Sequence, residues 1–152
     1  MMLEPGDAIP AVTLMDMEGV EFALDHYSGK PLVVYFYPKA DTPGCTNEAK
    51  DFTALADEYA AAGVPVIGIS RDKPAKLKKF SEKYGLSVIL ASDEPGDACA
   101  AFGTWVEKSL YGRTYMGIER ATFLFGAQGK VQRIWRKVKV KGHAAEVLEA
   151  AR

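Results

Sequence analysis

Apolar runs alternate with amphipathic stretches along most of this chain. Four runs are rich in aliphatic, β-branched and aromatic residues, at 32–37, 64–70, 87–92 and 121–126. Short continuous runs of this kind are typical of strands that are buried on both faces. We therefore expect these four segments to form the centre of a β-sheet.

Helical spacing of apolar residues predicts a helix after each of the first three runs and another at the end of the chain. The expected helices span 45–62, 71–85, 93–103 and 142–152. The first has one apolar stripe, which consists of Ala49, Phe52, Leu55, Ala56 and Tyr59. Strands that alternate with helices indicate an α/β protein whose mixed sheet is covered on both faces.

Two hairpins complete the expected elements. Residues 12–27 predict an N-terminal β-hairpin that turns at Glu18-Gly19. Near the other end, 121–126 is expected to pair with 130–140 through a turn at 127–129. The stretch "RKVKVK" alternates Lys with Val, so we expect the end of that last strand to have one solvated basic face.

Composition narrows the class of protein. A chain of 152 residues with 48% hydrophobic and 26% charged residues fits one domain, expected over 1–152. The net charge of -1 gives no reason to expect nucleic acid or a membrane surface as a partner. No signal peptide or membrane-spanning run is evident, and two cysteines do not make a secreted disulfide framework. We expect a cytoplasmic protein.

The stretch "PKADTPGCTNEAK" places Cys45 directly after the first buried strand and at the start of the following helix. Unpaired N–H groups and the dipole at a helix N-terminus favour the thiolate, which is the reactive form of cysteine. Thr42 adds a hydroxyl that can donate to sulfur or to a bound oxygen, and Gly44 allows backbone to approach a small ligand. Pro38 and Pro43 stiffen the segment.

A buried cysteine that only packs is the alternative for Cys45, because free cysteines are often buried. Its position among polar and turn-forming residues at a strand-to-helix junction favours a reactive thiol. There is no C-x-x-C motif, which argues against disulfide exchange of the thioredoxin type. His26, His143, Cys45 and Cys99 lack metal-ligand spacing, and no metal, haem or flavin cofactor is expected.

These residues resemble the peroxiredoxins, and most closely the bacterioferritin comigratory proteins, the Q group of that family. "YFYPKADTPGCTNEA" is similar to the loop P-x-x-x-T-x-x-C of the peroxidatic cysteine. "LYGRTYMGIERATFLF" resembles the later segment that carries an active-site arginine, and "VQRIWRKVKVKGHAAEVL" resembles the C-terminal strand and helix. The likeness runs from about Pro5 to Leu148.

The resemblance implies a thioredoxin-like fold and a thiol-dependent peroxidase that forms a sulfenic acid on Cys45. By the same resemblance, Thr42 and Arg120 position the peroxide, Pro38 shields the pocket and Glu48 orients the arginine. The alternative for Arg120 is a surface ion pair with Glu119. Neighbouring residues of a strand face opposite ways, so these two should not both point into the site.

The chain departs from the Q group in its second cysteine. Many members have one five residues after the first, where this chain has Lys50, and others have one in the next helix, near Ser81. The remaining candidate is Cys99, which we expect to be a buried packing residue rather than a resolving cysteine. The resemblance then implies a one-cysteine peroxidase.

We expect such an enzyme to reduce hydrogen peroxide and alkyl hydroperoxides and to be regenerated by thioredoxin, glutaredoxin or a small thiol, as a monomer or weak homodimer. The rival hypothesis is a peroxide-sensing or chaperone-like interaction protein with little turnover. Two weaker signals remain open. Trp105, Tyr111 and Tyr115 could line a pocket mouth, form an oligomer contact or pack in the core, and His143 is expected to cap a helix or lie on the surface.

Overall fold

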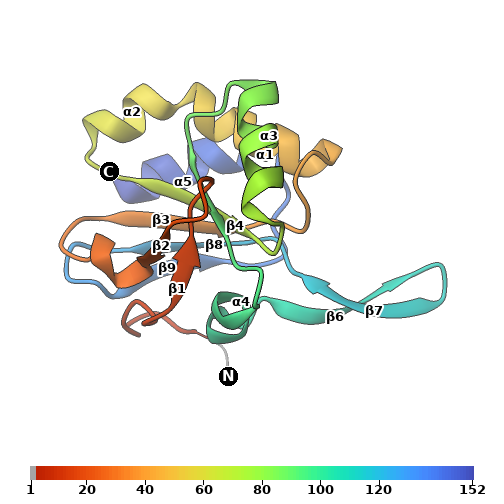
Figure 1. Ribbon diagram of the computed structural model, residues 1–152. Coiled ribbons are helices and arrows are strands. Elements are labelled where there is room, and N and C mark those ends of the chain that lie inside the picture. The colour runs from red at the N-terminus through yellow and green to blue at the C-terminus, as the bar shows by residue number, and fades with distance from the viewer. Residues whose placement is uncertain (1–2) are drawn as a thin grey trace.

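A mixed seven-stranded sheet forms the centre of the computed structural model, which describes residues 3–152 (Figure 1). The strands lie across the sheet in the order β2-β1-β5-β4-β3-β8-β9. β3, β4 and β5 are parallel, and the other neighbouring pairs are antiparallel. Their bounds are β1 Thr13–Met15, β2 Glu21–Ala23, β3 Leu32–Phe36, β4 Val66–Ser70, β5 Ile89–Ser92, β8 Ala121–Phe125 and β9 Val131–Trp135.

Helices cover both faces of this sheet (Figure 1). One face carries α1 Pro43–Ala54, α2 Ala56–Ala61, α3 Pro74–Tyr84 and α5 His143–Ala151. The other carries α4 Asp97–Phe102 and the short 3-10 helix η1 Leu24–Tyr27. None of the helices within residues 3–152 is both long and apolar enough to cross a bilayer. The expected mixed sheet, flanked by helices and preceded by an N-terminal hairpin, is confirmed.

Two hydrophobic cores follow from the alternation of side chains along β3. Val33 and Tyr35 belong to the core under α1, α3 and α5, which we call the first core. Val34 and Phe36 belong to the core that α4 covers, which we call the second core. Every residue of β3 is buried, as expected for a central strand. Gly68, opposite Tyr35 in the register, leaves room for the tyrosine ring, since a Cβ there would lie 2.6 Å from Tyr35 Cζ.

Several expected boundaries are wrong: the helices expected over 71–85 and 93–103 begin at Pro74 and Asp97, and residues 24–27 of the expected hairpin form η1. Two other differences have a clear cause in the backbone. The helix expected over 45–62 begins two residues earlier and divides at Leu55, whose ψ of 11° leaves the helical range and separates α1 from α2. The strand expected to reach residue 140 ends at Trp135. Beyond it Lys137 has a φ of 49°, and its N–H donates to Glu119 Oε2, so the backbone turns toward Glu119 instead of continuing the ladder.

A second, two-stranded sheet was not expected from the sequence. β6 (Trp105–Leu110) and β7 (Arg113–Ile118) form a hairpin that extends away from the main sheet (Figure 1). We call residues 105–118 the arm. Its base leads directly into Arg120 and β8, so the arm stands beside the segment that the resemblance marks as part of the site.

Candidate active site

The carboxyl end of β3 delivers Cys45 to the start of α1. After Tyr37 the chain makes a short loop, and Thr42 is the N-cap with an extended ψ of 156°. Pro43 and Gly44 occupy the first turn, which tolerates proline because its N–H groups have no helical partner. Cys45 is therefore the third residue of α1. Its side chain belongs to the first core, and the residue is 1% exposed.

Two anchors hold the loop that precedes Cys45. The Ala40 N–H donates to Asp72 Oδ2 over 2.8 Å, which ties the loop to the end of β4. Asp41 has a φ of 64°, an unusual value outside glycine that Asp tolerates better than most residues. Its carboxylate accepts hydrogen bonds from the Tyr84 hydroxyl and from Lys83 Nζ on α3. These two donors hold the pKa of Asp41 below its usual value.

Arg120 approaches Cys45 from the other side, out of the short link between β7 and β8. Its Nη2 lies 3.4 Å from Cys45 Sγ, and its Nη1 donates to Glu48 Oε1 over 2.7 Å. The Val138 N–H donates to the Arg120 carbonyl, so the chain beyond β9 supports this link. Glu119 pairs instead with Arg136, at 3.0 Å. The surface pair of Glu119 with Arg120 is thus absent, and the two side chains diverge as expected.

Gly44 makes room for the arginine. A Cβ at this position would lie 3.1 Å from Arg120 Nη2, closer than side chains normally approach. The sequence suggested that Gly44 would let backbone approach a ligand, whereas in the structure it is the guanidinium that comes close. The third position of the helix and its first-turn glycine together set the contact between nitrogen and sulfur.

Glu48 is a buried carboxyl group with one partner. It is 1% exposed, and only Oε1 is bonded, since Oε2 has no hydrogen-bond partner among residues 3–152. Burial raises the pKa of Glu48 from 4.5 to about 7, although the Arg120 charge and hydrogen bond act in the opposite direction. A carboxylate at this site is therefore held mainly by the arginine that it orients.

The structure brings Cys45, Glu48, Gly44 and Arg120 together, and it places Thr42 nearby with its hydroxyl turned elsewhere. The Thr42 hydroxyl donates to the Lys39 carbonyl over 2.8 Å. Its oxygen retains lone pairs that can accept a hydrogen bond from a ligand. Pro38 is half-buried at the start of the same loop.

Cys99 lies apart from this group. It is fully buried in α4 and belongs to the second core, on the opposite face of the sheet from Cys45. Its N–H donates to Asp93 Oδ2, and burial, reinforced by Asp93, raises the pKa of the Cys99 thiol. Both cysteines are free thiols. The packing that was expected for Cys99 is what the structure shows.

Other candidates from the sequence fall outside the site. His143 is buried, not on the surface, and its Nε2 lies 2.7 Å from Thr122 Oγ1. Trp105, Tyr111 and Tyr115 are exposed on the arm, which excludes core packing for them. Within residues 3–152 no cluster of His, Cys, Asp and Glu could hold a metal ion.

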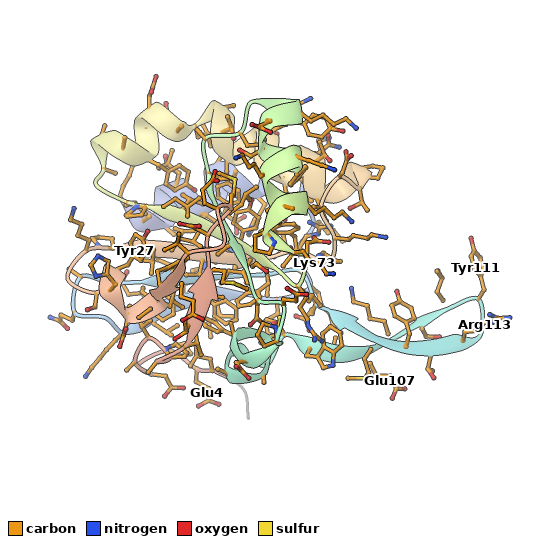
Figure 2. All side chains as sticks on the ribbon, in the orientation of Figure 1. Glu4, Tyr27, Lys73, Glu107, Tyr111 and Arg113 are labelled. Atoms are coloured by element: carbon orange, nitrogen blue, oxygen red, sulfur yellow. The ribbon has the colours of Figure 1, made fainter. Side chains whose placement is uncertain are left out.

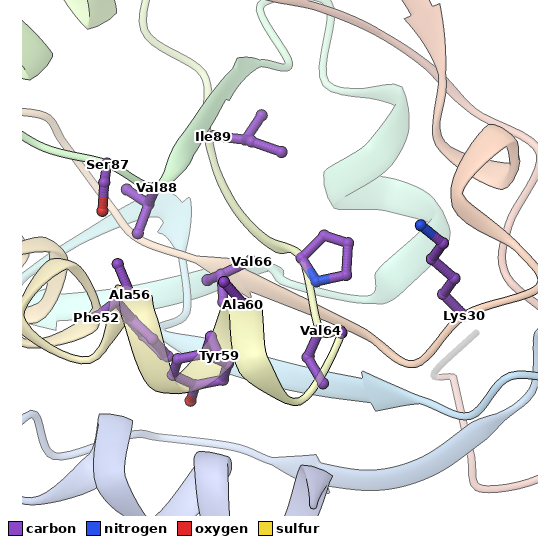
Figure 3. Close-up of a pocket in the computed structure, with 12 residues that line it drawn as sticks. Lys30, Phe52, Ala56, Tyr59, Ala60, Val64, Val66, Ser87, Val88 and Ile89 are labelled. Atoms are coloured by element: carbon purple, nitrogen blue, oxygen red, sulfur yellow. The ribbon is translucent and has the colours of Figure 1, made fainter.

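A cavity of about 330 Å³ opens at the other end of the parallel strands, under α2 (Figure 3). Its lining is mostly apolar, with Lys30 and Ser87 as polar members, and includes the starts of β4 and β5. Cys45 follows the carboxyl end of β3, so the cavity and the cysteine lie at opposite ends of the strands. The cavity has none of the predicted site residues.

Sequence reasoning missed the residues that hold the site in place. Asp72 and Asp41 anchor the cysteine loop, and neither was singled out. Their signals are faint but present. Asp41 precedes Thr-Pro, a pattern in which Thr can cap the helix and the residue before it can adopt a left-handed conformation. Asp72 precedes Lys-Pro, a pattern typical of a turn before a helix.

The sequence matches the AhpC/TSA family over residues 5–134. The Escherichia coli protein named peroxiredoxin Bcp is 45% identical over 146 residues, which cover 96% of this chain and 94% of that protein. Among solved structures, the Xanthomonas campestris bacterioferritin comigratory protein has a TM-score of 0.88 and 43% identity, over 95% of this chain and 97% of that one. The Xylella fastidiosa PrxQ has a TM-score of 0.92 and 36% identity, over 99% and 96%. These likenesses confirm the thioredoxin-like fold.

Proposed function

The chain belongs to the AhpC/TSA family and is a thiol-dependent peroxidase, and from that premise we propose that Cys45 is its peroxidatic cysteine and its only redox-active one. The observation that carries the proposal is the fork of Arg120, which reaches Cys45 Sγ with one nitrogen and Glu48 Oε1 with the other. A guanidinium is permanently charged and planar, so it can touch sulfur and a bound oxygen at once.

The reaction follows from this placement. The Cys45 thiolate attacks the terminal oxygen of ROOH, the O–O bond breaks, and RO⁻ leaves and takes up a proton to become ROH, while the cysteine becomes a sulfenic acid. Negative charge moves from sulfur to the leaving oxygen during the attack. Donors fixed along that path stabilise the transition state more than the ground state. Arg120 is such a donor, and Glu48 keeps its fork in place.

Thr42 supplies an acceptor for the peroxide. Because its own hydroxyl proton is directed to the Lys39 carbonyl, its oxygen is free to accept a hydrogen bond from the O–H of a bound hydroperoxide. That contact would aim the terminal oxygen at the sulfur. We assign Pro38 and Gly44 to the walls of the pocket, Gly44 through the space that it leaves for Arg120.

Hydrogen peroxide and alkyl hydroperoxides are the proposed substrates. Alkyl hydroperoxides are supported by the structurally similar Xanthomonas campestris bacterioferritin comigratory protein, whose structures give insight into its alkyl peroxide reduction activity. Cys45 belongs to an apolar core, and such surroundings favour an alkyl substituent over a charged one. We place the enzyme in the reducing cytoplasm, where two free thiols are the normal state of a pair of cysteines.

A thiol from outside the chain must then reduce the sulfenic acid. By the resemblance to the Q group, Lys50 stands where many members have a second cysteine and Ser81 lies near where others have one, while Cys99 is packed into the other face of the sheet. A disulfide requires Cα atoms within about 7 Å of one another. To form a Cys45–Cys99 bridge, one of the two cores would have to open.

The test is peroxide consumption with dithiothreitol as reductant. Cys45→Ser should abolish turnover, and Cys99→Ala should keep the rate within about twofold of the wild type while it loses about 1 kcal/mol of stability from the second core. Mass spectrometry after one equivalent of peroxide should show a sulfenic acid on Cys45. Stoichiometric Cys45–Cys99 disulfide would refute the one-cysteine mechanism. A single oxidation event without sustained turnover would favour a peroxide-sensing protein instead.

A further inference from the structure

The arm has most of the exposed large hydrophobic side chains among residues 3–152. These side chains are Val20, Trp105, Leu110, Tyr111, Tyr115 and Met116, and within that range all but Val20 are on the arm. Tyr111 at its tip is 96% exposed. Figure 2 shows Tyr111 and Arg113 at the far end of the hairpin, away from the body of the protein. Clustered exposed apolar side chains mark interaction surfaces more often than chance.

The register divides the arm into two faces. Lys108 pairs with Tyr115 and Leu110 pairs with Arg113, and these pairs project on the same side. Val106 completes this side, which we call the docking face: Val106, Lys108, Leu110, Arg113 and Tyr115. The opposite side carries Trp105, Glu107, Ser109, Thr114 and Met116.

The docking face borders the active site. The Lys108 side chain lies across Gly117, with its Cδ 3.3 Å from where a Cβ would be, so it extends toward the base of the arm. Burial lowers the pKa of Lys108, the charge of Arg120 acts in the same direction, and Cys45 acts in the opposite direction. A molecule that reaches the sulfur of Cys45 from this side therefore meets the docking face.

Charge indicates what kind of molecule fits. The docking face has two cations, Lys108 and Arg113, and no acidic residue, because Glu107 projects on the other side. The chain as a whole carries a net charge of -1. Two copies of this chain that met through their docking faces would bring four cations together. A partner with carboxylates around an apolar centre is complementary instead.

We propose that the docking face receives the protein that regenerates Cys45, a dithiol protein whose reactive cysteine lies among apolar and acidic side chains. This proposal rests on the proposed function. A partner thiol attacks the sulfenic acid, so that a mixed disulfide forms and water leaves. The partner's second thiol then attacks the mixed disulfide, which releases the Cys45 thiol and leaves the partner oxidised. Two thiols supply the two electrons and two protons that the peroxide consumed.

The experiment compares two reductants on the full-length enzyme. Thioredoxin, kept reduced by its reductase and NADPH, is the dithiol protein, and dithiothreitol is the small thiol that needs no docking. Leu110→Ser and Arg113→Glu alter the docking face. Met116→Ser is the matched control, because Met116 lies on the other side of the same arm and is 49% exposed, against 56% for Leu110.

We expect Leu110→Ser and Arg113→Glu to raise the KM for thioredoxin about fivefold to tenfold. Their turnover with dithiothreitol and their rate constant with hydrogen peroxide should stay within about twofold of the wild type. Met116→Ser should leave both reductants unchanged.

Four results would overturn the proposal. The first is an enzyme that turns over with dithiothreitol but not with thioredoxin, and the second is a KM for thioredoxin that both docking-face variants leave unchanged. The third is a rise in that KM for Met116→Ser as large as for the docking-face variants. The fourth is a wild-type dimer in sedimentation that Leu110→Ser dissociates. Loss of the underlying peroxidase function would show itself separately, as an absence of dithiothreitol-driven turnover in the wild type.

Discussion

Because Gly44 has no side chain, the guanidinium of Arg120 can approach the sulfur of Cys45 closely. Gly44 and Cys45 are consecutive in the first turn of α1, and the guanidinium lies against both. The backbone of Gly44 is not in the left-handed region, so its conformation is open to any residue. The glycine is needed for space alone. Its replacement therefore tests the geometry of the site without strain in the helix.

Gly44→Ala should lower the second-order rate constant for peroxide about threefold to tenfold. The added Cβ would push Arg120 Nη2 away from Cys45 Sγ, which weakens one charged hydrogen bond in the transition state. The melting temperature should be equal or higher, because alanine favours the helix by up to about 1 kcal/mol. Stopped-flow oxidation and thermal unfolding measure the two effects. A wild-type rate constant would show that the contact of Arg120 with sulfur contributes little.

At the residue scale, local sequence pattern singled out Cys45 as a candidate more readily than it singled out the residues that contact Cys45. Cys45 follows a buried strand, a proline and a glycine and stands at a helix start, so local sequence pattern is enough to single it out. Arg120 is 75 positions further along, and no local pattern measures a distance through space. Its place came from the resemblance. From the sequence, the Thr42 hydroxyl could donate to sulfur or to a bound oxygen; in the structure it donates to the Lys39 carbonyl, because a nearby backbone acceptor competes for its proton.

At the element scale, the loop between β3 and α1 depends on anchors from other elements. Asp41 adopts a left-handed backbone that costs energy for most residues, and the bonds from Tyr84 and Lys83 hold its side chain there. The link to α3 thus fixes the approach to the N-cap of α1. A looser loop would let the first turn, and Cys45 with it, move relative to Arg120.

Asp41→Ala should loosen this loop, whereas Asp41→Asn should not. Asparagine accepts the left-handed conformation and can still bond the Tyr84 hydroxyl, although it loses the ion pair with Lys83. We expect amide exchange of residues 39–45 to become about tenfold faster in Asp41→Ala, and the peroxide rate constant to fall several-fold. Hydrogen-exchange mass spectrometry and stopped-flow oxidation are the measurements. Equal behaviour of the two variants would disprove the anchoring role.

Element boundaries were predicted where turn residues mark them. The helices expected to end at residues 85 and 103 do end there, because Gly85 and Gly103 follow α3 and α4 in left-handed conformations. The break at Leu55 has no glycine or proline beside it, so helical periodicity runs straight through. The arm escaped prediction because its two strands bury little and have no continuous apolar run. The break at Leu55 and the arm both depend on tertiary contacts, which the periodicity of the sequence does not reveal.

At the scale of the whole molecule, the sheet separates two chemical environments. Cys45, Glu48 and His143 belong to or border the core on one face, and Cys99 is enclosed in the other. The sequence predicted that both faces would be covered, since strands alternate with helices. It could not assign Cys99 to a face, because that depends on how α4 packs against the sheet. The two cores keep Cys45 and Cys99 on opposite faces of the sheet, which supports the proposed one-cysteine mechanism.

Two buried titratable groups near this site should shift stability in opposite directions with pH. Burial raises the pKa of Glu48 to about 7, so between pH 4.5 and 7 the folded state binds its proton more readily than the unfolded chain does. Its contribution to the free energy of unfolding therefore falls as pH rises through that window. Burial lowers the pKa of His143 from 6.5 to about 4, so its contribution falls as pH drops through 6.5.

The two slopes should largely cancel in the wild type between pH 4.5 and 6.5, and single substitutions should expose each of them. In that range Glu48→Gln should lose stability on acidification, by on the order of 2 kcal/mol relative to the wild type, and His143→Gln should gain a similar amount. Urea unfolding of the wild type, Glu48→Gln and His143→Gln at pH 4.5 and at pH 6.5, with equal m-values, gives the free energies of unfolding to compare. Carboxylates shared by all three proteins cancel in the differences. Parallel curves for the three would mean that neither group changes its proton affinity on folding.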